Sequence, residues 1–301
     1  MRFSIVAKKY LFMSLSLLVI GAGLVSAAIQ GFNLGIDFTG GTLLDLKFNK
    51  SVTVVQVREV LTAHNLENSV IQLAGTERTD AAPNVLIRTR VLNEAERKMV
   101  LDDFTAKLGK FDIMRIEKVG ATIGSELARD SIIALLLSWL AMILYVSYRF
   151  EFKFGVAGIL ALVHDVLIVV GIFSILRLEM DSSFVAALLT IIGYSINDTI
   201  VIFDRIRENL KTMKKGETLP ELVDKSIWQT MSRTIFTSLT VLFATAALYF
   251  LGGETTKTFS MALLIGFIAG TYSTVFIASP VWLAWKERDE RKRLEHKMRP
   301  A

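Results

Sequence analysis

The sequence contains no cysteine and only three histidines among its 301 residues. The absence of cysteine excludes a disulfide framework, a cysteine-based metal site and a thiol nucleophile. His64, His164 and His296 are too far apart in sequence to form a local ligand motif such as HExxH. We therefore expect no metal, no cofactor and no enzymatic chemistry. The net charge of +5 is modest, so the placement of the charges matters more than their sum.

Apolar residues, in contrast, make up 52% of the chain, and the mean hydropathy is +0.48. A bilayer core about 30 Å thick needs about 20 apolar residues in a helix. Candidate spans lie at approximately 10–29, 131–146, 156–176, 184–203, 235–251 and 259–285. The first of them has the basic flank of a signal peptide, but its apolar part is longer than a typical signal core. We interpret it as an uncleaved anchor.

Lysine and arginine predict the orientation of these spans. Nineteen of them fall on the side that holds both ends of the chain, and one lies in each short turn of the other side. We therefore predict that both termini are cytoplasmic. Trp282 and Trp285 suit an interfacial belt at the end of the last span. Residues 208–228 suggest a pair of interfacial helices that is broken at Gly216 and Pro220.

The polar stretch between the first two spans reads as a small extracytoplasmic domain. Residues 44–48 and 85–91 alternate as in half-buried strands, and residues 70–73 and 111–119 are further strand candidates. Residues 52–64 form one predicted helix, and Asn93 and Glu96 begin a second with a capping-box pattern. The order β-α-β-β-α-β is that of a ferredoxin-like α+β fold. We divide the chain into four parts. They are an N-terminus with its first span (1–29), the external domain (30–130), a five-helix bundle with a cytoplasmic loop at 204–233 (131–285), and a basic tail (286–301).

Just beyond the first span, the segment GIDFTGGT at 35–42 contains three glycines, Gly35, Gly40 and Gly41. Such a density indicates unusual backbone angles or a close contact. No GK[ST] follows, so this is not a phosphate loop. The segment either turns the chain from the membrane into the domain or couples the two, and Asp37 either caps this turn or contacts a partner.

The apolar run at 184–203 contains two adjacent polar residues, Asn197 and Asp198. A charged Asp within the hydrocarbon costs about 2.5–3.5 kcal/mol on insertion scales, so such residues by default mark ion or proton pathways. The alternative is a structural hydrogen bond, in which Ser195, Asn197 or Thr199 holds the carboxyl group.

Arg233 enters the next span at a depth similar to that of Asp198, because consecutive spans run antiparallel. A pair of these residues that separates during a conformational change would act as a proton switch. Alternatively, Arg233 is a snorkelling anchor. Thr237 belongs to a polar stripe on the same span, which either holds the helices together by packing or lines a water-filled path. His164 and Asp165 form a second polar island, either a proton relay or a structural contact.

Four segments together resemble the SecD/SecF family of protein-export membrane proteins, in its SecF branch. They are GIDFTGGT at 35–42, VGATIGSEL at 119–127, the stretch from HD at 164–165 through AALLTIIGYSINDTIVIFDRIREN at 186–209, and SRTIFTSLT at 232–240. The resemblance covers nearly the whole chain. It implies membership of the RND superfamily, and Asp198 and Arg233 fall where the family has its intramembrane proton-transport residues.

The resemblance further implies a subunit of the bacterial inner membrane that assists the Sec translocase by using the proton-motive force to draw polypeptide outward. The expected partners are SecD as an obligate membrane subunit, the SecYEG translocon, YajC and YidC, the translocating polypeptide and protons, with no nucleic acid. RND units have two six-span halves, and this chain supplies one half, which also predicts an integral partner.

Two other functions fit the same sequence. One is a stand-alone RND-type transporter of small solutes or lipids, against which the small external domain argues weakly. The other is a non-transporting assembly factor, in which Asp198 only packs. That alternative predicts that Asp198→Asn is harmless, because Asn keeps the size of the side chain and most of its hydrogen bonds.

Overall fold

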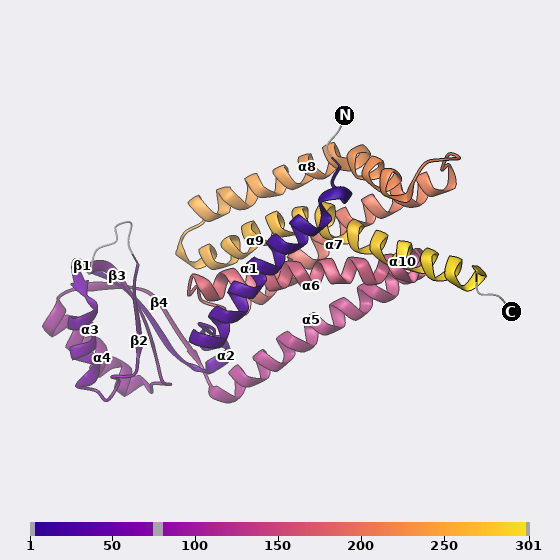
Figure 1. Cartoon of the computed structure of the whole chain (residues 1–301). Coiled ribbons are helices and arrows are strands. Elements are labelled where there is room, and N and C mark those ends of the chain that lie inside the picture. The colour runs from indigo at the N-terminus through magenta and orange to yellow at the C-terminus, as the bar shows by residue number, and fades with distance from the viewer. Residues whose placement is uncertain (1–3, 75–80, 299–301) are drawn as a thin grey trace. The chain divides into compact units, whose positions relative to one another are not determined.

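The computed structural model of the chain describes residues 4–74 and 81–298, so the ends of the predicted segments 1–29 and 286–301 lie outside the described residues. The chain separates into two compact units (Figure 1). One contains Met1–Asn33 and Ile133–Ala301, and the other contains Leu34–Ile132.

Within the described residues, six helical segments are long and apolar enough to cross a membrane, which confirms the predicted number. Their helices are α1 (Lys9–Gln30), α5 (Ala121–Arg149), α6 (Phe152–Ile175), α7 (Ser182–Lys211), α8 (Leu219–Leu251), α9 (Glu254–Ser273) and α10 (Ser279–Met298). A short 3₁₀ turn, η1 (Val6–Lys8), precedes α1, and a π-helical turn, η2 (Thr274–Ala278), joins α9 to α10. The last span therefore consists of α9, η2 and the start of α10.

The helices of the bundle differ greatly in burial. In the most apolar 18-residue stretch of α6, 61% of the residues are buried, whereas the corresponding fraction in α5 is 6%. An apolar helix with so little contact inside its own chain needs lipid or another protein around it. Trp282 is fully buried and stacks on Phe154, with 4.6 Å between the ring centroids. The interpretation of Trp282 as an interfacial residue is therefore wrong, because the rings pack inside the bundle instead.

Helices α1 and α6 pack through small residues. A Cβ atom built on Gly23 would collide with the backbone of Gly171, so the two helices approach as closely as their backbones allow. Near the end of α1, the hydroxyl groups of Ser26 and Ser174 lie 3.0 Å apart and share a hydrogen bond. Small residues are the usual means of close helix contact in membranes, where apolar burial gives no preference for protein over lipid.

Gly23→Ala is expected to weaken the packing of α1 on α6. Overpacking a close contact costs about 1–3 kcal/mol, and here the opposing atoms belong to a backbone that cannot rotate away. The check is the thermal unfolding of the purified full chain in detergent. Gly21→Ala is the matched control, because it lies on the same helix and no atom is within 4 Å of the position that its methyl group would take. Equal stability of the two variants would contradict the prediction.

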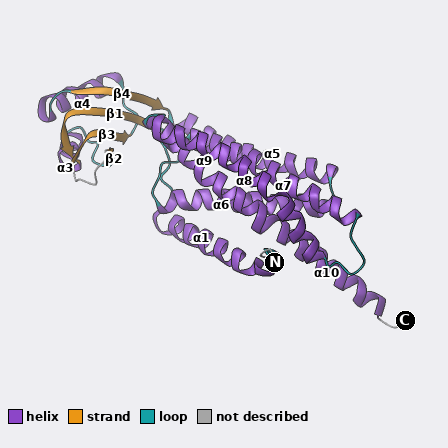
Figure 2. Ribbon diagram, turned by 90° about the horizontal axis from the view of Figure 1, so that it is seen from above, coloured by secondary structure: helices purple, strands orange, loops and turns teal. Residues whose placement is uncertain are grey.

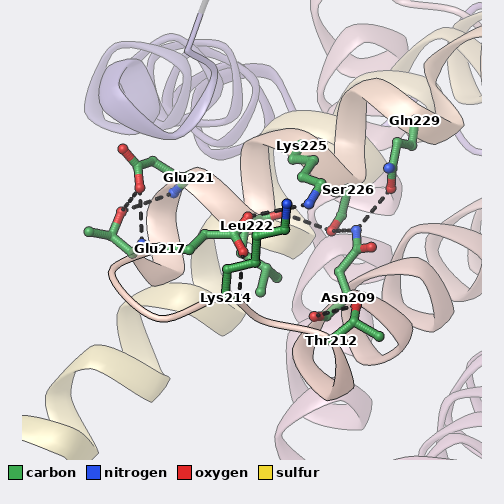
Figure 3. A network of polar contacts seen from close by, with 10 residues as sticks. Asn209, Thr212, Lys214, Glu217, Glu221, Leu222, Lys225, Ser226 and Gln229 are labelled. Atoms are coloured by element: carbon green, nitrogen blue, oxygen red, sulfur yellow. Dashed lines mark hydrogen bonds and ion pairs between the residues drawn. The ribbon is translucent and has the colours of Figure 1, made fainter.

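The connection between α7 and α8 is a short polar turn rather than a pair of interfacial helices (Figure 3). Helix α7 continues to Lys211 and α8 begins at Leu219, with Pro220 in its first turn and a capping box between Thr218 and Glu221. Proline is favourable at this position because its missing N–H would have no helical partner there. The sequence interpretation of 208–228 is thus wrong.

Polar side chains stabilise this turn and the helix ends beside it. The Asn209 amide donates to the Ser226 hydroxyl at 2.8 Å and to the Gln229 side-chain oxygen at 2.9 Å (Figure 3). Lys225 and the backbone N–H of Lys214 both contact the Glu217 carboxylate, at 3.4 and 3.1 Å. These bonds join α7 to α8 beyond the predicted membrane spans.

The second unit has the predicted ferredoxin-like order. Its elements are the short helix α2 (Ile36–Thr39), β1 (Gly41–Thr53), α3 (Val54–Thr62), β2 (Val70–Ala74), β3 (Ala81–Thr89), α4 (Glu94–Leu108) and β4 (Phe111–Val119). The four strands form one antiparallel sheet in the order β2-β3-β1-β4 (Figure 2). The fold prediction for this segment is confirmed.

The core of this unit lies between the sheet and its two longer helices. Leu44, Leu46 and Phe48 of β1 alternate toward the helices and are at most 2% exposed. They pack with a group from α3 and α4 that includes Val57 and Phe104. The alternation along β1 and the helical spacing of the apolar residues thus converge on one buried layer, as the sequence predicts.

The capping box of α4 provides a pH-dependent contact. The Arg90 guanidinium bonds Glu96 at 2.8 Å, and this bond, followed by the backbone N–H of Asn93, lowers the pKa of the Glu96 carboxyl group. A lowered folded-state pKa adds stability above the ordinary Glu value of about 4.3, and the gain disappears as the pH falls through the folded value.

Glu96→Gln should therefore lower the thermal stability of the full chain at pH 7, and the difference from the unsubstituted chain should shrink as the pH falls below the ordinary Glu value of about 4.3 and vanish below the lower folded-state pKa. Gln retains the capping geometry, so the ion pair with Arg90 is what is removed. Glu94→Gln is the control for the loss of one negative charge at the same helix start. If Glu96→Gln and Glu94→Gln behave alike at pH 7, the ion pair contributes nothing.

Candidate functional site

Asp198 lies inside the membrane-spanning part of α7 and is 4% exposed. Its Oδ2 atom is buried and has no hydrogen-bond partner among the described residues. Buried carboxylate oxygens are normally paired, since leaving one unsatisfied costs about 1–3 kcal/mol or more. Within the described residues, no structural hydrogen bond therefore accounts for this oxygen.

The three neighbours that the sequence offered as partners of Asp198 make other contacts. The Ser195 hydroxyl donates to Asp165 at 2.7 Å. The Thr199 hydroxyl shares a hydrogen bond of 2.9 Å with Thr274. Asn197 is exposed on another side of α7. The structural alternative, in which one of them holds the Asp198 carboxyl group, has no hydrogen bond to support it here, because successive helix positions are rotated by about 100° and face different neighbours.

On the facing helix α8, Arg233 and Thr237 interact electrostatically with the Asp198 carboxylate. Arg233 is exposed and does not come within 4.0 Å of Asp198, so in this structure the two do not form an ion pair. The Thr237 hydroxyl also donates to the Arg233 carbonyl oxygen at 2.9 Å. One turn away, the Thr234 hydroxyl is buried and has no partner among the described residues.

His164 and Asp165 form the centre of a buried hydrogen-bond chain that joins three helices. His164 Nδ1 is 3.0 Å from Asp165 Oδ1, and His164 Nε2 is 2.9 Å from the Ser16 hydroxyl of α1. Asp165 Oδ2 accepts from Ser195 of α7. Asp165 itself is completely buried. The predicted polar island is thus a connected network, and it is separate from the contacts of Asp198.

Sequence reasoning missed the contribution of α9 and η2 to this region. The Tyr272 ring stacks on the His164 ring, with 6.0 Å between their centroids, and its hydroxyl donates to the Phe12 carbonyl oxygen at 2.8 Å. Thr274, which pairs with Thr199, begins the π-helical turn. A cluster of Thr and Ser in an otherwise apolar span was the available signal, and π-bulges often accompany functional sites.

The glycine segment packs against the first turn of α5. Gly40 and Gly41 have φ values of +70° and +140°, which favour glycine. A Cβ atom on Gly40 would lie 2.7 Å from the Ala121 Cα atom, and one on Gly124 would lie 2.9 Å from the Gly40 nitrogen. The two glycine-containing motifs of the sequence are therefore in direct contact.

The other members of the segment have different surroundings. Gly35 is buried and is the N-cap of α2, with an ordinary φ of −70°. Asp37 is half-buried in the first turn of that short helix, where a carboxylate is favourable because the first backbone N–H groups of a helix have no helical partner. The segment is thus a compact helical turn followed by two glycines, not an open loop.

Comparison with known families matches two models along the chain. The model described as "Protein export membrane protein SecD/SecF, C-terminal" matches residues 100–288. The model described as "SecD/SecF GG Motif" matches residues 25–52, which contain the glycine segment. The first match alone covers more than half of the chain and includes the helices that carry Asp198 and Arg233.

Individual relatives agree with these models. The chain is 48% identical to the protein translocase subunit SecF of Acidaminococcus fermentans over 96% of its own length and 99% of that protein. It is 42% identical to the protein translocase subunit SecDF of Thermus thermophilus, over 91% of this chain and 37% of that longer protein. The crystal structure of a Thermus thermophilus SecDF, described as a translocon-associated membrane protein, matches with a TM-score of 0.87 and 39% identity, over 95% of this chain and 39% of that one. The chain belongs to the SecD/SecF family of protein-export membrane proteins.

Proposed function

We propose that the chain is the SecF-type subunit of a Sec protein translocase and that it couples proton movement through Asp198 to polypeptide export. The observation that carries the proton-coupling part is the unpaired Oδ2 atom of Asp198, buried in a spanning helix opposite Arg233. Family membership supports the export role. A carboxylate in such a place takes up and releases protons when its surroundings change.

The proposed switch alternates between two arrangements of α7 and α8. When Arg233 approaches, the carboxylate of Asp198 is stabilised and releases its proton. When Arg233 withdraws toward the membrane surface, the low dielectric around Asp198 favours the protonated form, which needs no counter-ion. In the present structure, Arg233 interacts electrostatically with Asp198 without forming an ion pair within 4.0 Å.

The His164–Asp165 network has a supporting role in this proposal. Its hydrogen bonds to Ser16 and Ser195 hold α1 and α7 against α6, and the network can pass protons between its members.

The order Ser16, His164, Asp165 is that of a hydrolase triad. All three are less than a tenth exposed, so no substrate carbonyl can reach the Ser16 hydroxyl, and we assign no covalent chemistry. Asn197 and Thr237 belong to the same proposal as further polar groups of the spanning helices α7 and α8.

The proposed placement puts both termini and the α7–α8 turn in the cytoplasm and residues 30–130 outside the inner membrane. The asymmetry of Lys and Arg supports this orientation. The low burial of α1 and α5 supports an integral partner, for which a SecD subunit is the candidate, since the Thermus thermophilus relative is named SecDF. The proposal also includes contacts with SecYEG, YajC, YidC and the moving polypeptide. It includes as well the division of the chain into the segments 1–29, 30–130, 131–285 and 286–301.

The test replaces the SecF subunit of a bacterial strain by this chain together with its own SecD-type partner. Recovery of secretion of a precursor protein, measured by signal-peptide removal in pulse-labelled cells, is the expected result. A stand-alone solute or lipid transporter, or an assembly factor, would leave the secretion defect in place. Co-purification with the SecD-type subunit separates a failure of assembly from a failure of function.

A further inference from the structure

A polar cavity of about 400 Å³ lies between α5, α7 and α8 and involves none of the buried network around His164. Three arginines line it, Arg149, Arg205 and Arg233, and two acidic residues accompany them, Asp204 and Glu208. Each of the three helices contributes one arginine. The cavity is therefore built from charged groups that are distant in sequence.

The charges of this cavity do not cancel. Arg205 pairs with Glu208 at 2.9 Å, which neutralises both. Among the described residues, neither Arg149, Arg233 nor Asp204 has an ion-pair partner within 4.0 Å. Two guanidinium groups and one carboxylate of this cavity thus lack an ion-pair partner among the described residues, although the Arg149 guanidinium lies over the Phe150 ring, 5.5 Å from its centroid.

The depth of the cavity follows from the turn between α5 and α6. Helix α5 ends at Arg149, and α6 begins at Phe152. A turn with unpaired backbone groups cannot lie in hydrocarbon, so it marks the surface of the membrane. Tyr145 and Tyr148 are 60% and 93% exposed near this helix end, as expected for aromatic rings at the level of lipid headgroups.

We propose that this cavity binds the headgroup of phosphatidylethanolamine. Guanidinium groups suit phosphate oxygens, and basic pockets between spanning helices at the membrane surface are favourable places for lipid headgroups. Arg149 and Arg233 would hold the phosphodiester, and the Asp204 carboxylate would accept the ammonium group. Such a headgroup places its one phosphate against the two guanidinium groups and its one ammonium group against the Asp204 carboxylate. Arg233 belongs to both this site and the proposed proton switch, but Arg149 and Asp204 belong to this site alone, and lipid binding to variants of these two residues is measurable without export.

The test is native mass spectrometry of the delipidated complex of this chain with its SecD-type partner. Phosphatidylethanolamine, phosphatidylglycerol and phosphatidylcholine are added at equal concentration, and retained lipid is counted. We expect preferential retention of phosphatidylethanolamine. Arg149→Gln should reduce it roughly tenfold. Arg129→Gln is the matched control, because Arg129 lies on the same helix, pairs with Asp130 and does not line the cavity.

Asp204→Asn separates the two halves of the proposed headgroup site. It should lower the retention of phosphatidylethanolamine and leave phosphatidylglycerol unchanged or raised, since only the former has an ammonium group. Equal effects of Arg149→Gln and Arg129→Gln would overturn the proposal. So would displacement of the lipid by excess inorganic phosphate, which would indicate a free-anion site. Lipid retained by the isolated chain but absent from the complex would assign the cavity to the partner subunit.

Discussion

Asp198→Asn is expected to reduce protein export in the presence of a proton gradient to the level measured without one. Asn preserves the size of the side chain and can donate and accept hydrogen bonds, but it cannot exchange a proton near neutral pH. Because the Oδ2 atom has no partner among the described residues, the substitution breaks no bond to that atom. Folding and assembly should therefore survive. The measurement is precursor translocation into inverted vesicles that contain the chain and its SecD-type partner, with and without an imposed gradient.

Two further variants make this result interpretable. Asp112→Asn removes an exposed carboxylate on β4, outside the spanning helices, and should leave export unchanged. Arg233→Gln should resemble Asp198→Asn, because a neutral side chain cannot drive the release of the proton. Undiminished gradient-dependent export by Asp198→Asn would show that Asp198 only packs, and the energy coupling would then belong to the partner subunit.

Gly40→Val is expected to cause a large structural defect in the external domain. The new side chain would have to adopt a φ of +70° with a ψ of 163°, a backbone region that is essentially restricted to glycine and costs other residues about 1–3 kcal/mol. It would also collide with the backbone of Ala121, and overpacking adds about 1–3 kcal/mol. Export should fall strongly, and hydrogen exchange should show opening of the first turn of α5. Export and exchange are measured on the complex with the SecD-type partner.

The controls for this substitution separate its two causes. Gly109→Val also introduces a side chain at a positive φ, +100°, but no atom lies within 4 Å of the position that its Cβ atom would take. Gly120→Val has neither a positive φ nor a close neighbour at that position. The loss of export should therefore be largest for Gly40→Val, smaller for Gly109→Val and smallest for Gly120→Val. If Gly109→Val is as harmful to export as Gly40→Val, the contact with α5 is not what matters.

Much of the fold was predictable because the relevant signals are local. The alternation of Leu44, Leu46 and Phe48 predicts that one face of β1 packs against helices, and this signal does not depend on the rest of the chain. Asn93 begins α4 because its side chain satisfies a backbone N–H three residues ahead. Apolar length alone identifies the spans. The same local logic failed at 208–228, where Pro220 begins a helix instead of breaking one.

The candidate site was predictable in its residues but not in its pairings. A carboxylate in an apolar run draws attention to Asp198 without any knowledge of its neighbours. Which group faces it depends on how each helix is rotated about its axis. Ser195 lies three positions away, about 60° around α7, and this is enough to turn its hydroxyl toward Asp165 on α6 instead.

The six spans, the order of strands and helices in the external domain and the identity of the intramembrane polar residues are all readable from the sequence. These follow from hydrophobic length, from periods of 2 and 3.6 residues, and from the cost of placing a charge in lipid. Only the folded chain shows that Gly23 contacts Gly171, that Gly40 contacts α5 and that Asp198 and Arg233 form no ion pair within 4.0 Å. In an apolar bundle most faces of a helix are equally hydrophobic, so contacts between small residues and a few polar side chains set the rotation of each helix.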